Sequence, residues 1–147
     1  MKKAIATFGI LLAGLIAFGQ QNDNPNAPQI EFEKELHDYG TIDQGGDGVY
    51  EFVFTNTGKE PLIITSCKGS CGCTVPVWPN EPIAPGQSDV IRVKYDTKRL
   101  GPFNKSVTII SNAATPTKVI RIKGKVVAPE GGAPKPAGSA AVPGSGK

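Results

Sequence analysis

The sequence predicts an all-β domain, an immunoglobulin-like antiparallel β-sandwich of about seven strands. Several short segments alternate apolar and polar residues, so that every second side chain faces a core; the apolar members are Tyr50, Phe52 and Phe54, then Ile91, Val93 and Tyr95, then Ile120 and Ile122. Turn-forming residues separate these segments. No helical period follows the first twenty residues, which favours a sandwich, with an open antiparallel barrel as the alternative.

The first residues have the order of an export signal. Lys2 and Lys3 precede an uncharged, mostly apolar run over residues 4–18, which is shorter than the about 20 residues of a membrane span. We therefore predict a signal peptide over residues 1–19, cleaved after Gly19; the alternative is an uncleaved N-terminal anchor. Cleavage predicts a periplasmic or secreted protein with no stable membrane span.

Composition divides the remaining chain into three parts. Residues 20–29 are polar and contain Pro25 and Pro28, which predicts a linker. Residues 30–128 are long enough for one core and too few for two, so they form the β-sandwich domain. Residues 129–147 consist mainly of Gly, Pro, Ala and Ser, and we predict that this tail is disordered because it has little apolar surface to bury.

Within the domain, strands and turns follow one another in a regular order. The expected strands cover residues 50–55, 62–65, 91–95, 107–110 and 120–123, the second and fourth being short apolar runs with β-branched residues. The turns between them fall at residues 47–48, 56–58, 85–86, 100–102 and 112–116, which contain Gly, Pro, Asn or Asp.

The charge balance gives no reason to expect nucleic acid as a partner. Loss of Lys2 and Lys3 reduces the 16 basic residues to 14, against 13 acidic ones, so the processed protein has almost no general field for polyanions. Acidic residues gather early in the domain and basic ones late. We interpret this asymmetry as the solvent-exposed faces of strands whose charges pair across the sheet. A basic binding face is the alternative.

The residues that an enzyme would need are scarce. His37 is the one histidine, and no serine or cysteine near it in sequence completes a triad, so we interpret it as a structural residue. No phosphate-binding glycine loop is present. We therefore expect neither catalytic residues nor a cofactor, and a hydrolase remains a remote alternative.

Three cysteines, Cys67, Cys71 and Cys73, lie within eleven residues, and thiols outside the cytoplasm usually oxidise. We expect them near the turn of one strand pair, as a disulfide-braced cysteine hairpin. Residues two apart on a strand have Cα atoms about 6.5 Å from each other, so a bridge from Cys71 to Cys73 requires Gly72 to bend the backbone. Three pairings are possible and each leaves one cysteine over, which is then free, joined to another molecule or in rapid exchange with its neighbours.

Two other hypotheses use the same cysteines. One is a thiol-redox site, in which the odd thiol exchanges with its neighbours. The other is a metal site in which Cys67, Cys71 and Cys73 bind copper or zinc. The metal hypothesis needs a fourth ligand from His37, a carboxylate or water, and the spacing differs from that of structural zinc sites.

Several motifs together resemble bacterial domain-of-unknown-function family 1573. They are Phe54-Thr55-Asn56-Thr57-Gly58-Lys59-Glu60-Pro61-Leu62, Ser70-Cys71-Gly72-Cys73-Thr74-Val75-Pro76 with Trp78-Pro79, Glu81-Pro82-Ile83-Ala84-Pro85-Gly86, Gly101-Pro102-Phe103-Asn104-Lys105, Ser111-Asn112-Ala113 and Ile122-Lys123-Gly124-Lys125-Val126. The resemblance covers nearly all of residues 30–127.

The resemblance implies an exported immunoglobulin-like domain related to the Hydin and major-sperm-protein group, with a special role for Cys71 and Cys73. The third cysteine, Cys67, departs from the family pattern. The resemblance and the scarcity of catalytic residues together predict a non-enzymatic binding or scaffolding module. Its expected partner is a protein or a component of the cell envelope. The alternative function is that of a thiol-redox or metal-handling protein.

Overall fold

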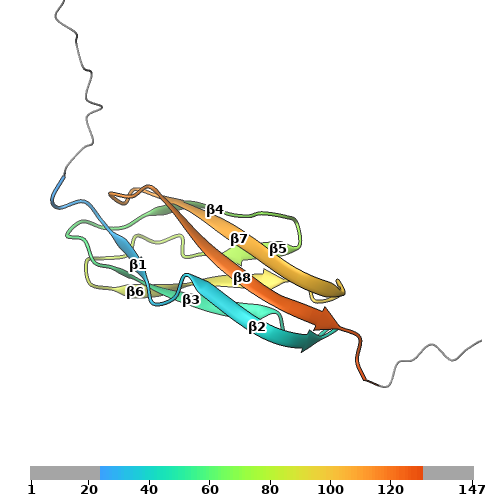
Figure 1. The fold of residues 1–147 in the computed structure, drawn as a ribbon. Helices are drawn as coiled ribbons and strands as arrows, with labels where there is room; N and C mark the ends of the chain where they lie inside the picture. The colour runs from blue at the N-terminus through green and yellow to red at the C-terminus, as the bar shows by residue number, and fades with distance from the viewer. Residues whose placement is uncertain (1–23, 131–147) are drawn as a thin grey trace, which may run out of the picture.

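Two four-stranded sheets face each other in the computed structural model, which describes residues 24–130 (Figure 1). The first sheet has the order β1 (Ile30–Phe32), β3 (Val49–Asn56), β6 (Ser88–Tyr95) and β5 (Thr74–Val77). The second has the order β2 (Leu36–Asp43), β8 (Thr117–Val127), β7 (Gly101–Ser111) and β4 (Ile64–Gly69). The predicted all-β sandwich is confirmed, with eight strands in place of about seven. The predicted signal peptide, residues 20–23 of the predicted linker and residues 131–147 of the predicted tail lie outside the described residues.

All strand pairs are antiparallel except one. The strand β2 runs parallel to β8 along the margin of the second sheet, so this sheet is mixed and not purely antiparallel. Its register is interrupted between Asp38 and Thr41, where Gly40 has a φ of 63°, a left-handed conformation that glycine adopts without strain. The extra residue changes which positions face inward, so both Tyr39 and Ile42 pack against the core.

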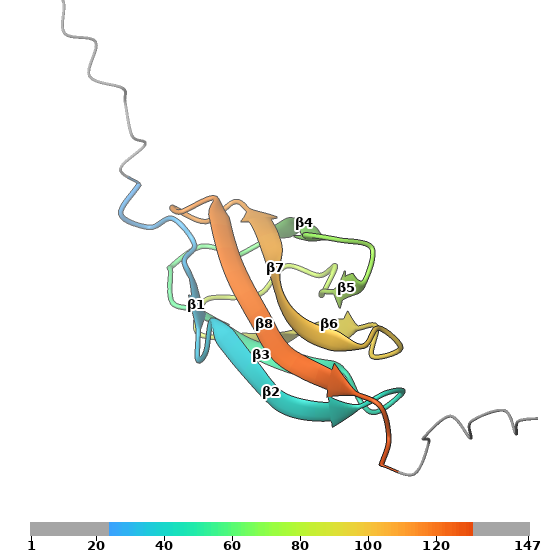
Figure 2. The same ribbon diagram turned by 45° about the vertical axis from the view of Figure 1, so that its right-hand side comes forward.

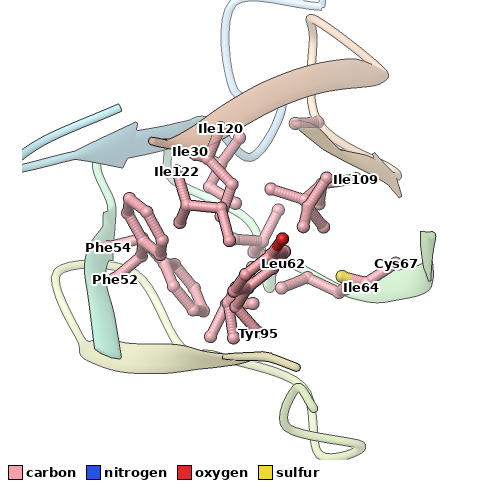
Figure 3. Close-up of a cluster of buried hydrophobic side chains, with 14 of the residues drawn as sticks. Ile30, Phe52, Phe54, Leu62, Ile64, Cys67, Tyr95, Ile109, Ile120 and Ile122 are labelled. Carbon is pink, nitrogen blue, oxygen red and sulfur yellow. The ribbon is translucent and has the colours of Figure 1, made fainter. Parts of the chain in front are cut away.

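The core fills the space between the sheets with side chains from alternate positions. Phe52 and Phe54 of β3 face Ile120 and Ile122 of β8, and none of these four side chains is more than 1% exposed (Figure 3). The period-two pattern therefore predicted correctly which faces are buried. Burial of a large apolar side chain contributes about 1.5–3 kcal/mol, so these alternating positions account for much of what holds the two layers together.

One polar side chain, that of Asn56, is completely buried at the end of β3. Its amide nitrogen donates to the carbonyl oxygens of Glu60 (2.8 Å) and Ile83 (3.0 Å). Its amide oxygen accepts from the backbone N–H groups of Gln29 (3.3 Å) and Gly58 (3.0 Å). A single side chain thus joins the segment before β1, the turn after β3 and the connection that leads into β6.

Part of the predicted linker is attached to the domain. The backbone N–H of Lys59 donates to the carbonyl of Asn26 (3.2 Å), and that of Ala114 donates to the carbonyl of Pro28 (2.9 Å). Residues 24–29 therefore extend along the sandwich before β1 begins. The described chain enters at one end of the sandwich and leaves at the other, after β8 (Figure 1).

Candidate functional site

The cysteines lie where the chain crosses from one sheet to the other. β4 pairs with β7 in the second sheet, whereas β5 pairs with β6 in the first. Figure 2 shows the two strands on the same side of the sandwich, in different layers. The expected cysteine hairpin is therefore wrong, because β4 and β5 do not pair with each other. Turn-forming residues between two strands occur in a hairpin and in a crossing alike, so the sequence does not distinguish them. We call residues 69–74 the cysteine corner.

A tight turn brings Cys71 and Cys73 together. The backbone N–H of Thr74 donates to the carbonyl of Cys71 (3.2 Å), and the Cα atoms of the two cysteines lie 5.2 Å apart with their sulfurs joined as a disulfide. The turn shortens the Cα separation below that of an extended strand, as the spacing argument required. Gly72 does so without a positive φ, and no atom lies within 4 Å of where a Cβ would be.

Gly69 permits the close approach of the two sheets at this corner. A Cβ at this position would collide with the backbone carbonyl oxygen of Thr74, so no larger residue fits without a backbone shift. Neither Gly69 nor Thr74 was predicted from the sequence as a site residue. The available signal was a glycine at the end of an apolar, β-branched run, which is a known mark of close backbone approach.

Cys67 is separate from the disulfide. Its side chain points into the core from β4 and is 8% exposed, as Figure 3 shows beside Ile64. Burial raises the pKa of the Cys67 thiol to about 12, because desolvation disfavours the thiolate. A protonated, buried thiol is a poor nucleophile and a poor metal ligand.

The three cysteines do not form a metal centre. Within residues 24–130, no group of three or more histidine, cysteine or acidic side chains is arranged to hold a metal ion. Two of the three sulfurs are joined to each other, and His37, the histidine offered as a fourth ligand, lies on β2. The structure therefore gives no support to the metal alternative.

Hydrogen-bond donors surround the two bonded sulfurs. The backbone N–H of Cys73 donates to the Sγ of Cys71 (3.3 Å). The Oγ1 of Thr74 lies 3.7 Å from the Sγ of Cys71 and 3.8 Å from that of Cys73. Cys71 is partly exposed, whereas Cys73 and Thr74 are 4% and 3% exposed. The disulfide thus has one accessible sulfur and one buried sulfur, with a hydroxyl within reach of both.

One margin of the second sheet, formed by β4, is open. Within the described chain β4 pairs only with β7. The backbone N–H of Ser70 donates to Ser106 of β7 (2.8 Å), and hydrogen-bonding direction alternates along an antiparallel strand. Lys68 therefore also faces β7, whereas Cys67 and Gly69 turn their N–H and C=O groups away from the sheet.

A groove of about 420 Å³ runs along this open margin on the outer face of the sheet. It is lined by residues of β4, of the turn after it and of β7: Ser66, Lys68, Gly69, Ser70, Thr108 and Ile110. Most of the surface that lines the groove is apolar, and hydroxyl groups and the ammonium group of Lys68 supply its polar contacts. The groove and the cysteine corner share Gly69 and Ser70, so they form one continuous candidate site.

The other sheet margins are protected, whereas β4 pairs regularly with β7 from Ser66 to Gly69, after a register shift between Ile64 and Ser66. β5 contains Pro76, which has no N–H to offer to an added strand. β1 has only three residues, and β2 is interrupted by its bulge at Gly40. Edge strands of these kinds resist pairing with another chain.

His37 is a packing residue in this structure. Its ring stacks on Tyr50 of β3, with centroids 3.5 Å apart, and meets the edge of Tyr39 at 4.4 Å. Desolvation by burial, followed by the charge of Lys34, lowers the pKa of the imidazole from its ordinary 6.5, while Asp38 acts in the opposite direction. The ring therefore joins the two sheets as a neutral aromatic group.

This geometry predicts a pH dependence of stability. The folded protein binds a proton at His37 less readily than the unfolded chain, so the free energy of unfolding falls as the pH drops through about 6.5 and levels off below the folded pKa. A His37→Phe variant keeps the stack but cannot titrate. We expect thermal unfolding at pH 7.5 and pH 5 to show a smaller difference in Tm for this variant than for the wild type. An equal difference would show that His37 does not contribute.

Charged side chains pair across strands, as predicted for their alternation. The outer faces carry ion pairs between Glu51 and Arg92, which join β3 to β6, and between Asp38 and Lys123 (3.2 Å), which join β2 to β8. All four side chains are largely exposed, so each pair contributes at most about 1 kcal/mol. These pairs join acidic residues from the first part of the domain to basic residues from its later part.

Solved structures with the same fold come from very different organisms. A protein of unknown function from Porphyromonas gingivalis W83 is 20% identical with a TM-score of 0.61, over 69% of this chain and 48% of that one; this chain thus spans about half the length of that protein. The PapD-like domain 7 of human CEP192 is 8% identical with a TM-score of 0.61, over 83% and 99% of the two chains. The Vibrio cholerae VesB protease is 18% identical with a TM-score of 0.54, over 68% and 32%. Such low identities establish the fold alone.

The sequence itself matches one family model. No curated protein matches the chain. Separately, within residues 24–130 no helix has the length and apolar character that a membrane span requires. The family model described as "Protein of unknown function (DUF1573)" matches residues 30–126, which are nearly the whole sandwich and include the cysteine corner. The chain therefore belongs to the DUF1573 family, as its motifs predicted.

Proposed function

We propose that this protein is an exported, non-enzymatic binding module that receives an extended segment of a partner protein along the free margin of β4. The observation that carries this proposal is that, among residues 24–130, no strand pairs with the outer edge of β4 at Cys67 and Gly69, beside the groove. Export is part of the proposal and is supported by Lys2, Lys3 and the apolar run over residues 4–18.

The mode of binding follows from the geometry of an edge strand. A segment that adds to β4 forms main-chain hydrogen bonds with Cys67 and Gly69, which contribute affinity without regard to sequence. Its side chains on the outer face then lie against the groove. Lys68 takes part in none of the ion pairs among the described residues. An acidic or hydroxyl-rich segment therefore suits this groove better than a basic one.

Amide hydrogen exchange tests the proposal in the free protein and in the complex. In the free protein the amides of Cys67 and Gly69 should exchange faster than those of Lys68 and Ser70, because only the latter are bonded to β7. A bound partner should slow exchange at Cys67 and Gly69. Unchanged exchange at both positions in the presence of a saturating partner would contradict strand addition at β4.

Photo-crosslinking in the native host identifies that partner. A photoreactive side chain at Lys68, on β4, should capture a defined protein, whereas one at Lys94, on the outer face of the opposite sheet, should not. Thr108→Arg fills the groove and should abolish capture. Asn104→Arg introduces the same charge on the same face outside the groove and should leave capture intact. Equal capture from Lys68 and Lys94, or equal effects of the two arginines, would overturn the proposed surface.

A further inference from the structure

The disulfide between Cys71 and Cys73 has hydrogen-bond donors beside its sulfurs that a purely structural disulfide does not need. A bridge that closes so short a segment removes little entropy from the unfolded chain, so its contribution to stability is small. Yet Thr74 places its hydroxyl within 4 Å of both sulfurs, and the N–H of Cys73 is directed at Cys71. Donors of this kind stabilise a thiolate, a species that an inert disulfide never forms.

We propose that Cys71 and Cys73 form a thiol-exchange site, in which Cys71 is the sulfur attacked by an external dithiol. Cys71 is partly exposed, whereas Cys73 is 4% exposed and belongs to the core. An attacking thiolate must approach in line with the sulfur–sulfur bond, so the accessible sulfur receives the attack. Cys67 takes no part because its thiol is buried and protonated.

The exchange balances in two steps. First, a thiolate of a protein or small-molecule dithiol bonds to the Sγ of Cys71, the bond to Cys73 breaks, and the Cys73 thiolate takes up a proton. The Oγ1 of Thr74 is placed to donate a hydrogen bond to that leaving sulfur. Second, the other thiol of the dithiol attacks its own bridged sulfur and releases Cys71. The dithiol becomes a disulfide and two electrons reach the Cys71 and Cys73 pair; Cys73 takes up one of the dithiol's two protons, solvent takes the other, and Cys71 is left as a thiolate.

The hydrogen bond from the N–H of Cys73 gives the reduced state its asymmetry. This donor and the Thr74 hydroxyl both reach Cys71, the accessible sulfur, so the reduced protein presents a stabilised thiolate at its surface. The same thiolate performs the reverse reaction on a disulfide partner. The site therefore operates stoichiometrically in either direction, as the redox partner of a dithiol or a disulfide.

Single-cysteine variants of the full chain test the assignment of roles. With Cys67→Ala in the background, Cys73→Ser leaves Cys71 and Cys71→Ser leaves Cys73. Glutathione disulfide should form a mixed disulfide with the Cys73→Ser protein at least about tenfold faster than with the Cys71→Ser protein, because thiolate character and access both favour Cys71. Mass spectrometry of the folded proteins measures the two rates. Equal rates, or faster reaction of Cys73, would overturn the assignment.

Two further measurements separate an exchange site from a brace. Millimolar dithiothreitol should reduce the wild-type pair while the circular dichroism of the folded protein persists; reduction only after unfolding would overturn the proposal. Thr74→Val in the Cys73→Ser background should shift the pH midpoint of Cys71 alkylation upward, because the hydroxyl donor is lost. A purely structural Thr74 would leave that midpoint unchanged.

Discussion

Replacement of Gly69 by alanine is expected to reduce the free energy of unfolding by about 3 kcal/mol, the upper part of the range for overpacked sites. The added Cβ would clash with the carbonyl oxygen of Thr74. The Cβ is attached to the backbone of β4 and the oxygen belongs to the backbone of β5. Because both backbones are held in a sheet, neither atom can move without disturbing β4 or β5. Chemical denaturation of the purified domain measures the loss.

Gly72→Ala is the matched control for this prediction. It makes the same chemical change three residues away in the same corner, but its Cβ meets no atom within 4 Å and its φ is not positive. We expect a change within about 0.5 kcal/mol, as for an ordinary surface site. If the two variants lose equal stability, the close approach of the two sheets at Gly69 is not what requires glycine there.

Removal of the Asn56 side chain is expected to have an effect at least as large, about 3–4 kcal/mol for Asn56→Ala. The substitution removes the hydrogen bonds to the carbonyls of Glu60 and Ile83 and from the backbone N–H groups of Gln29 and Gly58. The Ile83 carbonyl keeps its bond from the N–H of Leu62, so three backbone groups lose their partner. Each unsatisfied buried group costs about 1–3 kcal/mol, and partial access of water to some of them limits the total. Thermal and chemical denaturation give the measured value.

Asn112 provides the comparison, because it bridges backbone groups in the same manner but at the surface. Its side chain accepts from the N–H of Ile63 (2.8 Å) and donates to the carbonyl of Pro61 (3.1 Å), and it is exposed. Water can replace those bonds, so Asn112→Ala should cost about 1 kcal/mol or less. A loss as large as that of Asn56→Ala would mean that burial is not what makes Asn56 important.

The sequence predicted the strands whose two faces differ strongly. In β3 aromatic residues occupy every second position from Tyr50, and in β8 Ile120 and Ile122 alternate with Arg121 and Lys123. The structure buries Phe52, Phe54, Ile120 and Ile122. β1, β2 and β5 were not identified individually, and β5 has only four residues with Pro76 among them. β1 has only three residues, and the bulge at Gly40 disrupts the period of β2, whose inward side chains include the polar aromatic residues His37 and Tyr39.

The sequence predicted where the candidate site lies, but not how its strands and side chains are arranged. The density of cysteines pointed to residues 67–73, and the structure places a disulfide there. Whether two successive strands pair or belong to different sheets depends on partners far along the chain, here β6 and β7, and no local pattern encodes that choice. The roles of Gly69 and Thr74 and the open margin of β4 all follow from the crossing, so they required the structure.

The parallel pairing of β2 with β8 has a consequence for the timing of folding. The strand β2 pairs only with β8 among the described strands. A chain that is synthesised from its N-terminus therefore cannot complete the second sheet until β8 has emerged. Closing so long a loop is slow compared with forming a local turn. We therefore expect the second sheet to be completed late in folding, after β8 has been synthesised.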